Sequence, residues 1–267
     1  MIQNIGIVGC GAIAKAILRA RDAGELPIAI AGVTSRTEAS ARAFLETLKE
    51  PPPFLPLAEL IQRADLLVEA AGGQVVPGLA AEAFAAGKGL MVISVGALLE
   101  HPDIIEQARA QGLPLFIPSG AIAGLDGIKG ACVGAVSFVR LTSRKPPRAL
   151  EGAPYLASQG ISLAGLMEER ELFCGPARLA AKGFPDNLNV SAALSLAGLG
   201  PDKTEVRVVA VPGLQRNCHD IEVEGEFGRL HVHIENIPSE NPKTGRMTAL
   251  SIVRALRDAV DPVRIGT

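Results

Sequence analysis

The segment IGIVGCGAIA, residues 5–14, decides the fold of the N-terminal half of the chain. Gly9, Gly11 and Ala14 have the G-x-G-x-x-[G/A] spacing of the turn that joins a strand to a helix in dinucleotide-binding domains. The first glycine permits the tight turn, the second lets the backbone approach a pyrophosphate, and a small third residue lets the helix pack on the strand. The helix N-terminus then directs N–H groups at the phosphates. The residues predicted to contact the cofactor here are Gly9, Gly11, Ala12 and Ile13.

The glycine spacing is weak evidence alone, because a glycine turn without a ligand has the same pattern. The segments around the turn favour a turn that binds a ligand. Strand-like and helix-like segments alternate from the N-terminus to residue 117, which predicts an α/β domain with a Rossmann-type, doubly wound parallel sheet. The expected strands are 4–8, 28–34, 65–70, 90–95 and 113–117. The expected helices are 13–23, 37–48, 76–86 and 102–111.

The pattern changes after residue 119, where strand-like segments follow one another with few long helices between them. This favours a second, α+β domain built on a mostly antiparallel sheet with one face covered. We expect residues 1–120 to bind the dinucleotide, and residues 121–242 to provide the substrate site, the catalytic groups and the oligomer contacts. The tail, 243–267, has a helical apolar stripe and is expected to pack back on the first domain.

The end of the second strand, GVTSRT at 32–37, indicates which cofactor binds. A carboxylate at this point would bind the ribose 2′-hydroxyl of NAD, and the segment has none. Ser35 and Arg36 can instead hold the 2′-phosphate of NADP. A solvated surface arginine is the alternative for Arg36. The segment therefore favours NADP, or both cofactors, over strict use of NAD.

Two later strands end in small residues, VEAAGG at 68–73 and SVGAL at 94–98. The carboxyl ends of the strands face the ligand in a doubly wound sheet, so Ala71 is predicted to lie against the cofactor. Glu69 has two interpretations, a catalytic carboxylate or a structural acceptor for backbone N–H groups. The second is the more common role for a glutamate at a strand end.

In CHDIEVEGE, residues 218–226, acidic side chains occupy every second position and His219 falls on the apolar face with Ile221 and Val223. A satisfied core histidine is the usual explanation for such a residue. His231 and His233 alternate with apolar residues in the next strand, so we expect them on a solvated face opposite the acidic row. With this spacing they predict no metal site.

Composition excludes several classes of protein. Hydrophobic residues make up 48% and charged residues 20% of the 267-residue chain, and the formal net charge of −2 is unlike that of a nucleic-acid-binding protein. The longest uncharged run, 152–167, is shorter than the ~20 apolar residues of a membrane span. Four scattered cysteines and the lack of a cationic leader predict a cytoplasmic protein.

Several longer blocks together resemble the L-aspartate dehydrogenase family, and they extend over nearly the whole chain. The blocks are GCGAIA, VEAA, SVGAL, IPSGAIAGLDGIK, TSRKPP, GFPDNLNVSAALSLAGLG, NCHDIEVEGEFG and ENIPSENPKTGRMTALSIVRAL. The resemblance implies oxidative deamination of L-aspartate to iminoaspartate with NAD or NADP, or the reverse reductive amination. The imine would hydrolyse to oxaloacetate and ammonia, or feed NAD biosynthesis.

By the same resemblance, the active-site histidine is His219, and the nucleotide contacts include Ala123 and Asn189. Many relatives have an aspartate before the arginine of TSRT. This chain has Ser35 there, which argues against a strict preference for NAD. The chemistry calls for a base with a pKa near the operating pH, because hydride leaves an amino acid only when the amine is neutral, and imidazole suits this role. We expect this base to reach an interdomain cleft.

The sequence does not decide which groups bind the substrate carboxylates. Ser119, at the start of a backbone nest, and Asn187 are the predicted substrate contacts, and Asn187 equally suits a turn or helix cap. Arg144 and Lys145 are cationic alternatives, although such a loop is usually solvated. We expect a homo-oligomer, with a dimer as the simplest case, and no nucleic-acid or membrane partner. A reductase of another small acid or imine, or an NADP sensor without catalysis, would have the same domain plan.

Overall fold

The computed structural model describes residues 2–185, 188–238, 245–263 and 265–266. The chain divides into two compact units. The first unit contains Met1–Pro118 and Ala249–Arg264, and the second contains Ser119–Thr248 and Ile265–Thr267.

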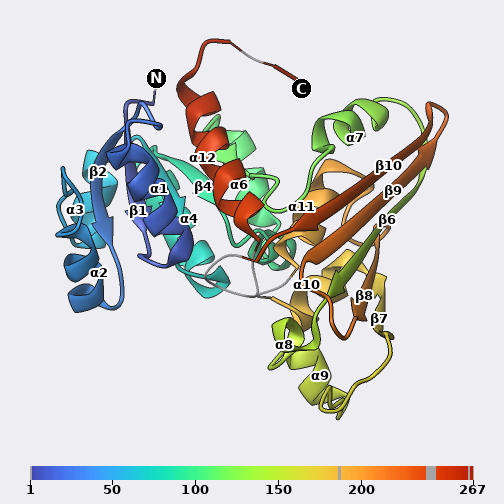
Figure 1. The fold of residues 1–267 in the computed structure, drawn as a ribbon. Coiled ribbons are helices and arrows are strands. Elements are labelled where there is room, and N and C mark those ends of the chain that lie inside the picture. The colour runs from blue at the N-terminus through green and yellow to red at the C-terminus, as the bar shows by residue number, and fades with distance from the viewer. Residues whose placement is uncertain (1, 186–187, 239–244, 264, 267) are drawn as a thin grey trace. The chain divides into compact units, whose positions relative to one another are not determined.

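The first unit is built on a five-stranded parallel sheet with strand order β2-β1-β3-β4-β5 (Figure 1). An isolated parallel bridge between Val33 and Phe54 adds a sixth position beyond β2. With that position included, the order is the 3-2-1-4-5-6 order of Rossmann domains, whose ligand crevice lies where the strand order reverses. Here the reversal falls between β1 and β3. The strands are β1 (Asn4–Val8), β2 (Ala29–Thr34), β3 (Leu66–Glu69), β4 (Gly89–Val92) and β5 (Leu115–Phe116).

Helices cover this sheet because its strands are apolar on both faces. Ile5 and Ile7 of β1 share a core with Ile17 of α1 and with Ile252 and Leu256 of α12. The helix α12 therefore returns to the first unit although it ends the chain. The helices are α1 (Ala12–Asp22), α2 (Glu38–Leu45), α3 (Leu57–Arg63), α4 (Val76–Ala85), α5 (Gly96–Glu100), α6 (Asp103–Gln111) and α12 (Arg246–Val260), with a 3₁₀ turn η1 (Gly73–Val75).

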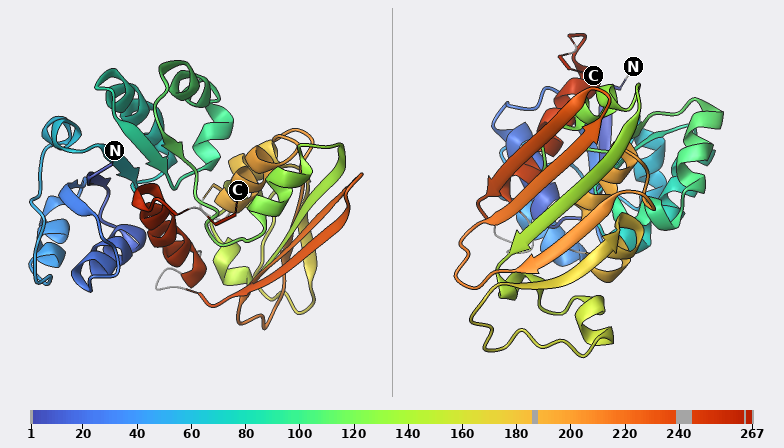
Figure 2. Two further views of the ribbon diagram at one scale, coloured as in Figure 1. Left: turned by 90° about the horizontal axis from the view of Figure 1, so that it is seen from above. Right: turned by 90° about the vertical axis from the view of Figure 1, so that its right-hand side faces the viewer.

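The second unit is built on a five-stranded mixed sheet with strand order β10-β9-β6-β8-β7 (Figure 2). Its strand pairs are antiparallel except for β6 with β8. The strands are β6 (Val136–Lys145), β7 (Arg170–Pro176), β8 (Glu205–Ala210), β9 (Asn217–Gly225) and β10 (Gly228–Asn236). The helices are α7 (Leu125–Ala131), α8 (Pro147–Leu150), α9 (Pro154–Ser158), α10 (Ala177–Gly183) and α11 (Asn189–Ala197).

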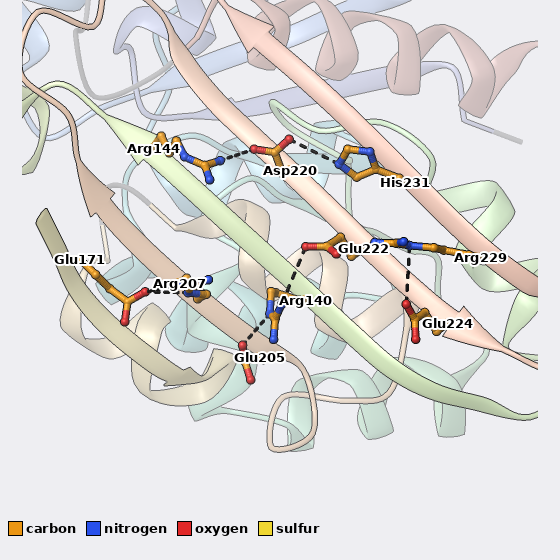
Figure 3. A network of polar contacts seen from close by, with 10 residues as sticks. All are labelled: Arg140, Arg144, Glu171, Glu205, Arg207, Asp220, Glu222, Glu224, Arg229 and His231. Carbon is orange, nitrogen blue, oxygen red and sulfur yellow. Dashed lines mark hydrogen bonds and ion pairs between the residues drawn. The ribbon is translucent and has the colours of Figure 1, made fainter. Parts of the chain in front are cut away.

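The two faces of the second sheet differ in chemistry, because alternate side chains point to opposite sides. The face that we call the inner face packs into the core of the unit and includes Leu141, Val206 and Ile221. The opposite, outer face has a row of ion pairs (Figure 3). Arg140 bridges Glu205 and Glu222, Arg207 pairs with Glu171, and Asp220 accepts from Arg144 and contacts both His231 and His233.

The predicted fold class, a Rossmann domain followed by an α+β domain on a mostly antiparallel sheet, is confirmed. The outward placement of His231 and His233 is also confirmed, since they pair in register with Glu222 and Asp220. The sequence did not reveal α3, β7 or the parallel pairing of β6 with β8. That pairing needs a crossover connection, and the chain between the two strands forms α8, α9, β7, α10 and α11.

Candidate active site

The glycine turn after β1 has the geometry that its spacing predicts. Gly9 has φ of +102°, and a Cβ there would lie 2.3 Å from the carbonyl oxygen of Ala70, so only glycine fits. A Cβ at Gly11, in contrast, would meet nothing within 4 Å. Ala14 is fully buried beneath the start of α1. The structure thus needs Gly9 for its own packing and leaves open space over Gly11.

A hollow of about 600 Å³ lies beside this turn, within the size range of ligand sites. It brings together the carboxyl ends of β1, β2 and β3, which is the expected ligand position in a doubly wound sheet. Five of the predicted cofactor residues line it, namely Gly9, Gly11, Ser35, Arg36 and Ala71. Ala12 and Ile13 do not line it; they form the first turn of α1 immediately after Gly11.

The charge in this hollow is positive. Arg36 is the only charged residue among the described residues that line it, and the hydroxyl groups of Ser35, Thr37 and Ser40 lie on the same rim. No aspartate or glutamate occurs in that lining. Arg36 is exposed and Ser35 is half-buried. This arrangement of one guanidinium with several hydroxyl donors suits a phosphate group.

Glu69, at the end of β3, is fully buried. One carboxylate oxygen accepts hydrogen bonds from the backbone N–H groups of Ala71 and Gly72, each at 2.8 Å, and the other accepts from Ser94 N at 2.9 Å. The Ser94 hydroxyl donates to the first of these oxygens, Oε1, at 3.1 Å. Glu69 therefore fixes the loops that follow β3 and β4, which favours the structural interpretation over a catalytic one.

In the second unit, polar side chains collect at one end of the otherwise apolar inner face. Ser143 and Lys145 lie near the carboxyl end of β6, Asn217 and His219 begin β9, and Asn236 ends β10. All five are buried, each at most 4% exposed. His219 pairs in register with Ser143 on one side and Ile234 on the other. We call this set the polar end of the inner face; its members are Ser143, Lys145, Asn217, His219 and Asn236.

Several of these atoms lack the partner that a buried polar atom normally has. Among the described residues, no hydrogen bond reaches the Ser143 hydroxyl, the Asn217 side-chain amide or Nδ1 of His219. Leaving such groups unsatisfied costs about 1–3 kcal/mol each. Polar atoms that are buried together without partners indicate a place where a polar ligand or water binds.

The electrostatics at His219 differ from the expectation. Burial, and secondarily the charge of Lys145, lower the pKa of His219 to about 3. The prediction of a pKa near the operating pH is therefore wrong for this protein without substrate, because the sequence does not give the depth of burial. The imidazole is neutral here, and a carboxylate brought beside it would raise its pKa.

The loop of residues 119–124 contains two more predicted residues, Ser119 and Ala123, both half-buried. The side-chain N–H of Asn236 donates to Ala121 O at 2.8 Å and so fixes this loop to the polar end. A Cβ on Gly120 would lie 3.7 Å from Val190, the residue after Asn189, which begins α11. Ser119, Ala123 and Asn189 thus lie in one region of the second unit. Asn187 lies outside the described residues.

Sequence reasoning missed several residues of the polar end. Asn217, Ser143 and Asn236 were not identified, and Lys145 was named only as one of two cationic alternatives in a segment expected to be a loop. The available signal was the period of two along β6, which puts Ser143 and Lys145 in phase with Leu141. Gln74, which lines the hollow of the first unit, was also missed because it lies in the η1 turn.

Fold and glycine turn together define a dehydrogenase of the two-domain type, with a dinucleotide-binding Rossmann unit and a second α+β unit. The two halves match separate family models: residues 9–118 match the NAD-binding domain of homoserine dehydrogenase, and residues 126–259 match the C-terminal domain of aspartate dehydrogenase.

Comparison with individual proteins gives the family. The chain is 44% identical to L-aspartate dehydrogenase 3 of Bordetella bronchiseptica, over 99% of this chain and 97% of the relative. It is also 44% identical to L-aspartate dehydrogenase of Bradyrhizobium diazoefficiens, over 99% and 94%. The crystal structure of aspartate dehydrogenase from Thermotoga maritima has the same fold, with a TM-score of 0.72, 24% identity and full coverage of both chains. This chain belongs to the L-aspartate dehydrogenase family.

Proposed function

We propose that the protein oxidises L-aspartate to iminoaspartate with NADP or NAD, or catalyses the reverse reductive amination. The observation that supports this most strongly is the buried imidazole of His219, whose Nδ1 has no partner among the described residues. It lies in the half of the chain that matches the aspartate dehydrogenase C-terminal model. A core histidine with a purely structural role would have its ring nitrogens satisfied.

The first unit fits a dinucleotide. We assign the pyrophosphate to the N-terminus of α1, where Gly11, Ala12 and Ile13 provide backbone N–H groups and the space over Gly11 is open. Gly9 and Ala71 line the hollow. Ser35 and Arg36 would hold a 2′-phosphate. When bound, the nicotinamide accepts the hydride from C2 of aspartate.

The second unit would provide the remaining nucleotide contacts and the substrate site. By family motif, Ala123 and Asn189 contact the nucleotide. Ser119, on the loop that Asn236 fixes, is assigned to the substrate. Asn187 keeps the same assignment from its motif alone, because it lies outside the described residues.

His219 serves in two proton transfers. The neutral imidazole first accepts a proton from the ammonium group of aspartate, so that the nitrogen lone pair can form the C=N bond as the hydride leaves. The imidazolium releases that proton to solvent, and the neutral ring then takes a proton from the water that adds to the iminium carbon and passes it to the nitrogen, so that ammonia departs as the C=O bond forms. Burial keeps the ring neutral before substrate binds, and the two carboxylates of aspartate would make it a stronger base.

Two further properties complete the proposal. The outer face of the second sheet, with its ion pairs, is bare of helices from the described part of its own unit, and we propose that it joins two copies in a dimer (Figure 2). No helix within the described residues is long and apolar enough to cross a membrane.

We place the reaction in the cytoplasm, which the four free cysteines support.

Absorbance at the reduced-nicotinamide band tests the proposal. The assay compares NADP and NAD against a panel of L-amino acids, and in reverse against oxaloacetate with ammonium. We expect turnover with L-aspartate and with oxaloacetate plus ammonium. Turnover with a different amino acid alone would favour another small-acid or imine reductase, and tight NADPH binding without any turnover would favour a sensor.

A further inference from the structure

Arg144 and Lys145 are adjacent in sequence but lie on opposite faces of the second sheet. Arg144 is on the outer face, where it pairs with Asp220 (Figure 3). Lys145 is on the inner face and only 2% exposed. Of the two cations considered for the substrate carboxylates, one is thus engaged in the ion-pair row and the other belongs to the polar end.

The neighbours of Lys145 at the polar end suit an anion. Ser143, two residues before it on the same face, has a buried hydroxyl without a partner among the described residues. The side-chain amide of Asn217, at the start of the neighbouring strand, is also buried without a partner among the described residues. One ammonium, one hydroxyl and one amide N–H are the donor set that binds a carboxylate in proteins.

The charge of Lys145 also acts on the catalytic imidazole. Burial lowers the pKa of Lys145 to about 8, and its charge contributes to the low pKa of His219. Cys218 and Asp220, the neighbours of His219 in sequence, point to the outer face. Among the described residues, His219 is therefore the titratable group that shares the polar end with Lys145. A carboxylate bound to Lys145 would offset its charge and make His219 easier to protonate.

We propose that Lys145 binds a carboxylate of the substrate, with Ser143 and Asn217 donating to the same group, and that this makes the site select dicarboxylates. The inference rests on the proposed function, since it names the residue that holds aspartate beside His219. It also explains why polar groups are buried together at one end of an apolar face.

The test compares Lys145→Met, which keeps length and removes charge, with Lys145→Arg and with Arg144→Met as the matched control from the other face. We expect Lys145→Met to raise the KM for L-aspartate and the dissociation constant of succinate by about 30-fold or more. Lys145→Arg should retain part of the affinity. Arg144→Met should stay within about twofold of the unchanged protein, because Arg144 pairs with Asp220 on the opposite face of the sheet from the polar end. Similar succinate affinity in Lys145→Met and Arg144→Met would overturn the inference.

Proton uptake gives a second readout that a structural role would not change. At pH 8.5 a lysine with a pKa of about 8 is mostly neutral, and a bound carboxylate would raise its pKa so that it takes up a proton from the buffer. Calorimetry of succinate binding in two buffers of different ionisation enthalpy should show uptake of a fraction of a proton by the unchanged protein. Lys145→Arg, always charged, should bind without uptake. Uptake that persists in Lys145→Arg would also overturn the inference.

These measurements separate the inference from the proposed function. NADPH affinity and the melting temperature report whether Lys145→Met still folds. If it does not fold, the proton uptake of the unchanged protein and of Lys145→Arg still tests the inference. If the protein fails to oxidise aspartate but binds succinate through Lys145, the proposed function fails and the inference stands. If it oxidises aspartate and Lys145→Met does so equally well, the inference alone fails.

Discussion

The hollow of the first unit and the polar end of the second unit offer a ligand different kinds of groups. The hollow is formed by a glycine turn, small residues and one exposed arginine, so the backbone supplies most of its surface. The polar end is formed by buried side chains, several of them without partners among the described residues. Backbone N–H groups bind phosphates without strict demands on side chains. Proton transfer and carboxylate binding instead need particular groups held in an environment that sets their pKa.

The difference implies that the two sites respond separately to substitution. Changes in the hollow should alter cofactor binding and leave the chemistry of the second unit intact. Changes at the polar end should alter turnover and substrate affinity and leave cofactor binding intact.

The largest effect is expected from His219→Gln. Loss of the base should lower kcat for L-aspartate by about 10²–10⁴-fold, while the dissociation constant of NADPH stays within about twofold, because the glycine turn is in the other unit. Steady-state kinetics and fluorescence titration measure the two values. His233→Gln is the control, since His233 lies on the outer face against Asp220. Equal losses in the two variants would remove His219 from the mechanism.

Gly9 and Gly11 provide the next contrast. A Cβ at Gly9 would clash with the backbone of Ala70, so Gly9→Ala should destabilise the protein by about 2 kcal/mol or more. Gly11→Ala should fold normally, because the space there is open. Its methyl group should lower the affinity for NADP by about tenfold or more, because it occupies the space assigned to the pyrophosphate. Thermal melting and NADP titration measure the pair. A Gly11→Ala variant with unchanged NADP affinity would contradict the assigned phosphate position.

Arg36→Met tests the cofactor preference. Removal of a charged donor to the 2′-phosphate should raise the dissociation constant of NADP by about 10-fold. NAD affinity should change little, because NAD has only a hydroxyl at that position. The ratio of the two dissociation constants is the measured quantity. An equal change for both cofactors would mean that Arg36 does not contact the 2′-phosphate.

The smallest effect concerns stability against pH. The pKa of His219 is about 3 in the folded protein, below its usual value near 6.5, so the unfolded chain binds this proton first and stability falls as pH drops below 6.5. Between pH 7 and 5.5 the unchanged protein should lose about 1 kcal/mol more than His219→Gln does. Urea unfolding at both pH values measures the difference.

His233 supplies the control of opposite sign for that experiment. Hydrogen bonding to Asp220 raises its pKa, so its contribution to stability is present below pH 6.5 and is lost as pH rises. His233→Gln should therefore make the loss on acidification larger. If His219→Gln and His233→Gln shift the pH dependence in the same direction, the burial of His219 is not the cause.

The sequence predicts the first site better than the second for a physical reason. Gly9, Gly11 and Arg36 can be identified from spacing, because a phosphate-binding turn depends on local backbone geometry. His219 can be placed on the correct face, because strands alternate strictly. Its low pKa cannot be predicted, because burial depends on the neighbours that tertiary folding brings to it. Lys145 could be named as a candidate but not placed on the buried inner face, because β6 extends to the residue before Pro146 and a cationic segment beside two prolines is typical of a loop.

A crystal structure of the protein with NADP and succinate tests the central claim most directly. The account predicts a succinate carboxylate within hydrogen-bond distance of the Lys145 ammonium, beside the His219 ring, and the 2′-phosphate of NADP against Arg36. Succinate bound away from Ser143, Lys145 and His219 would contradict it.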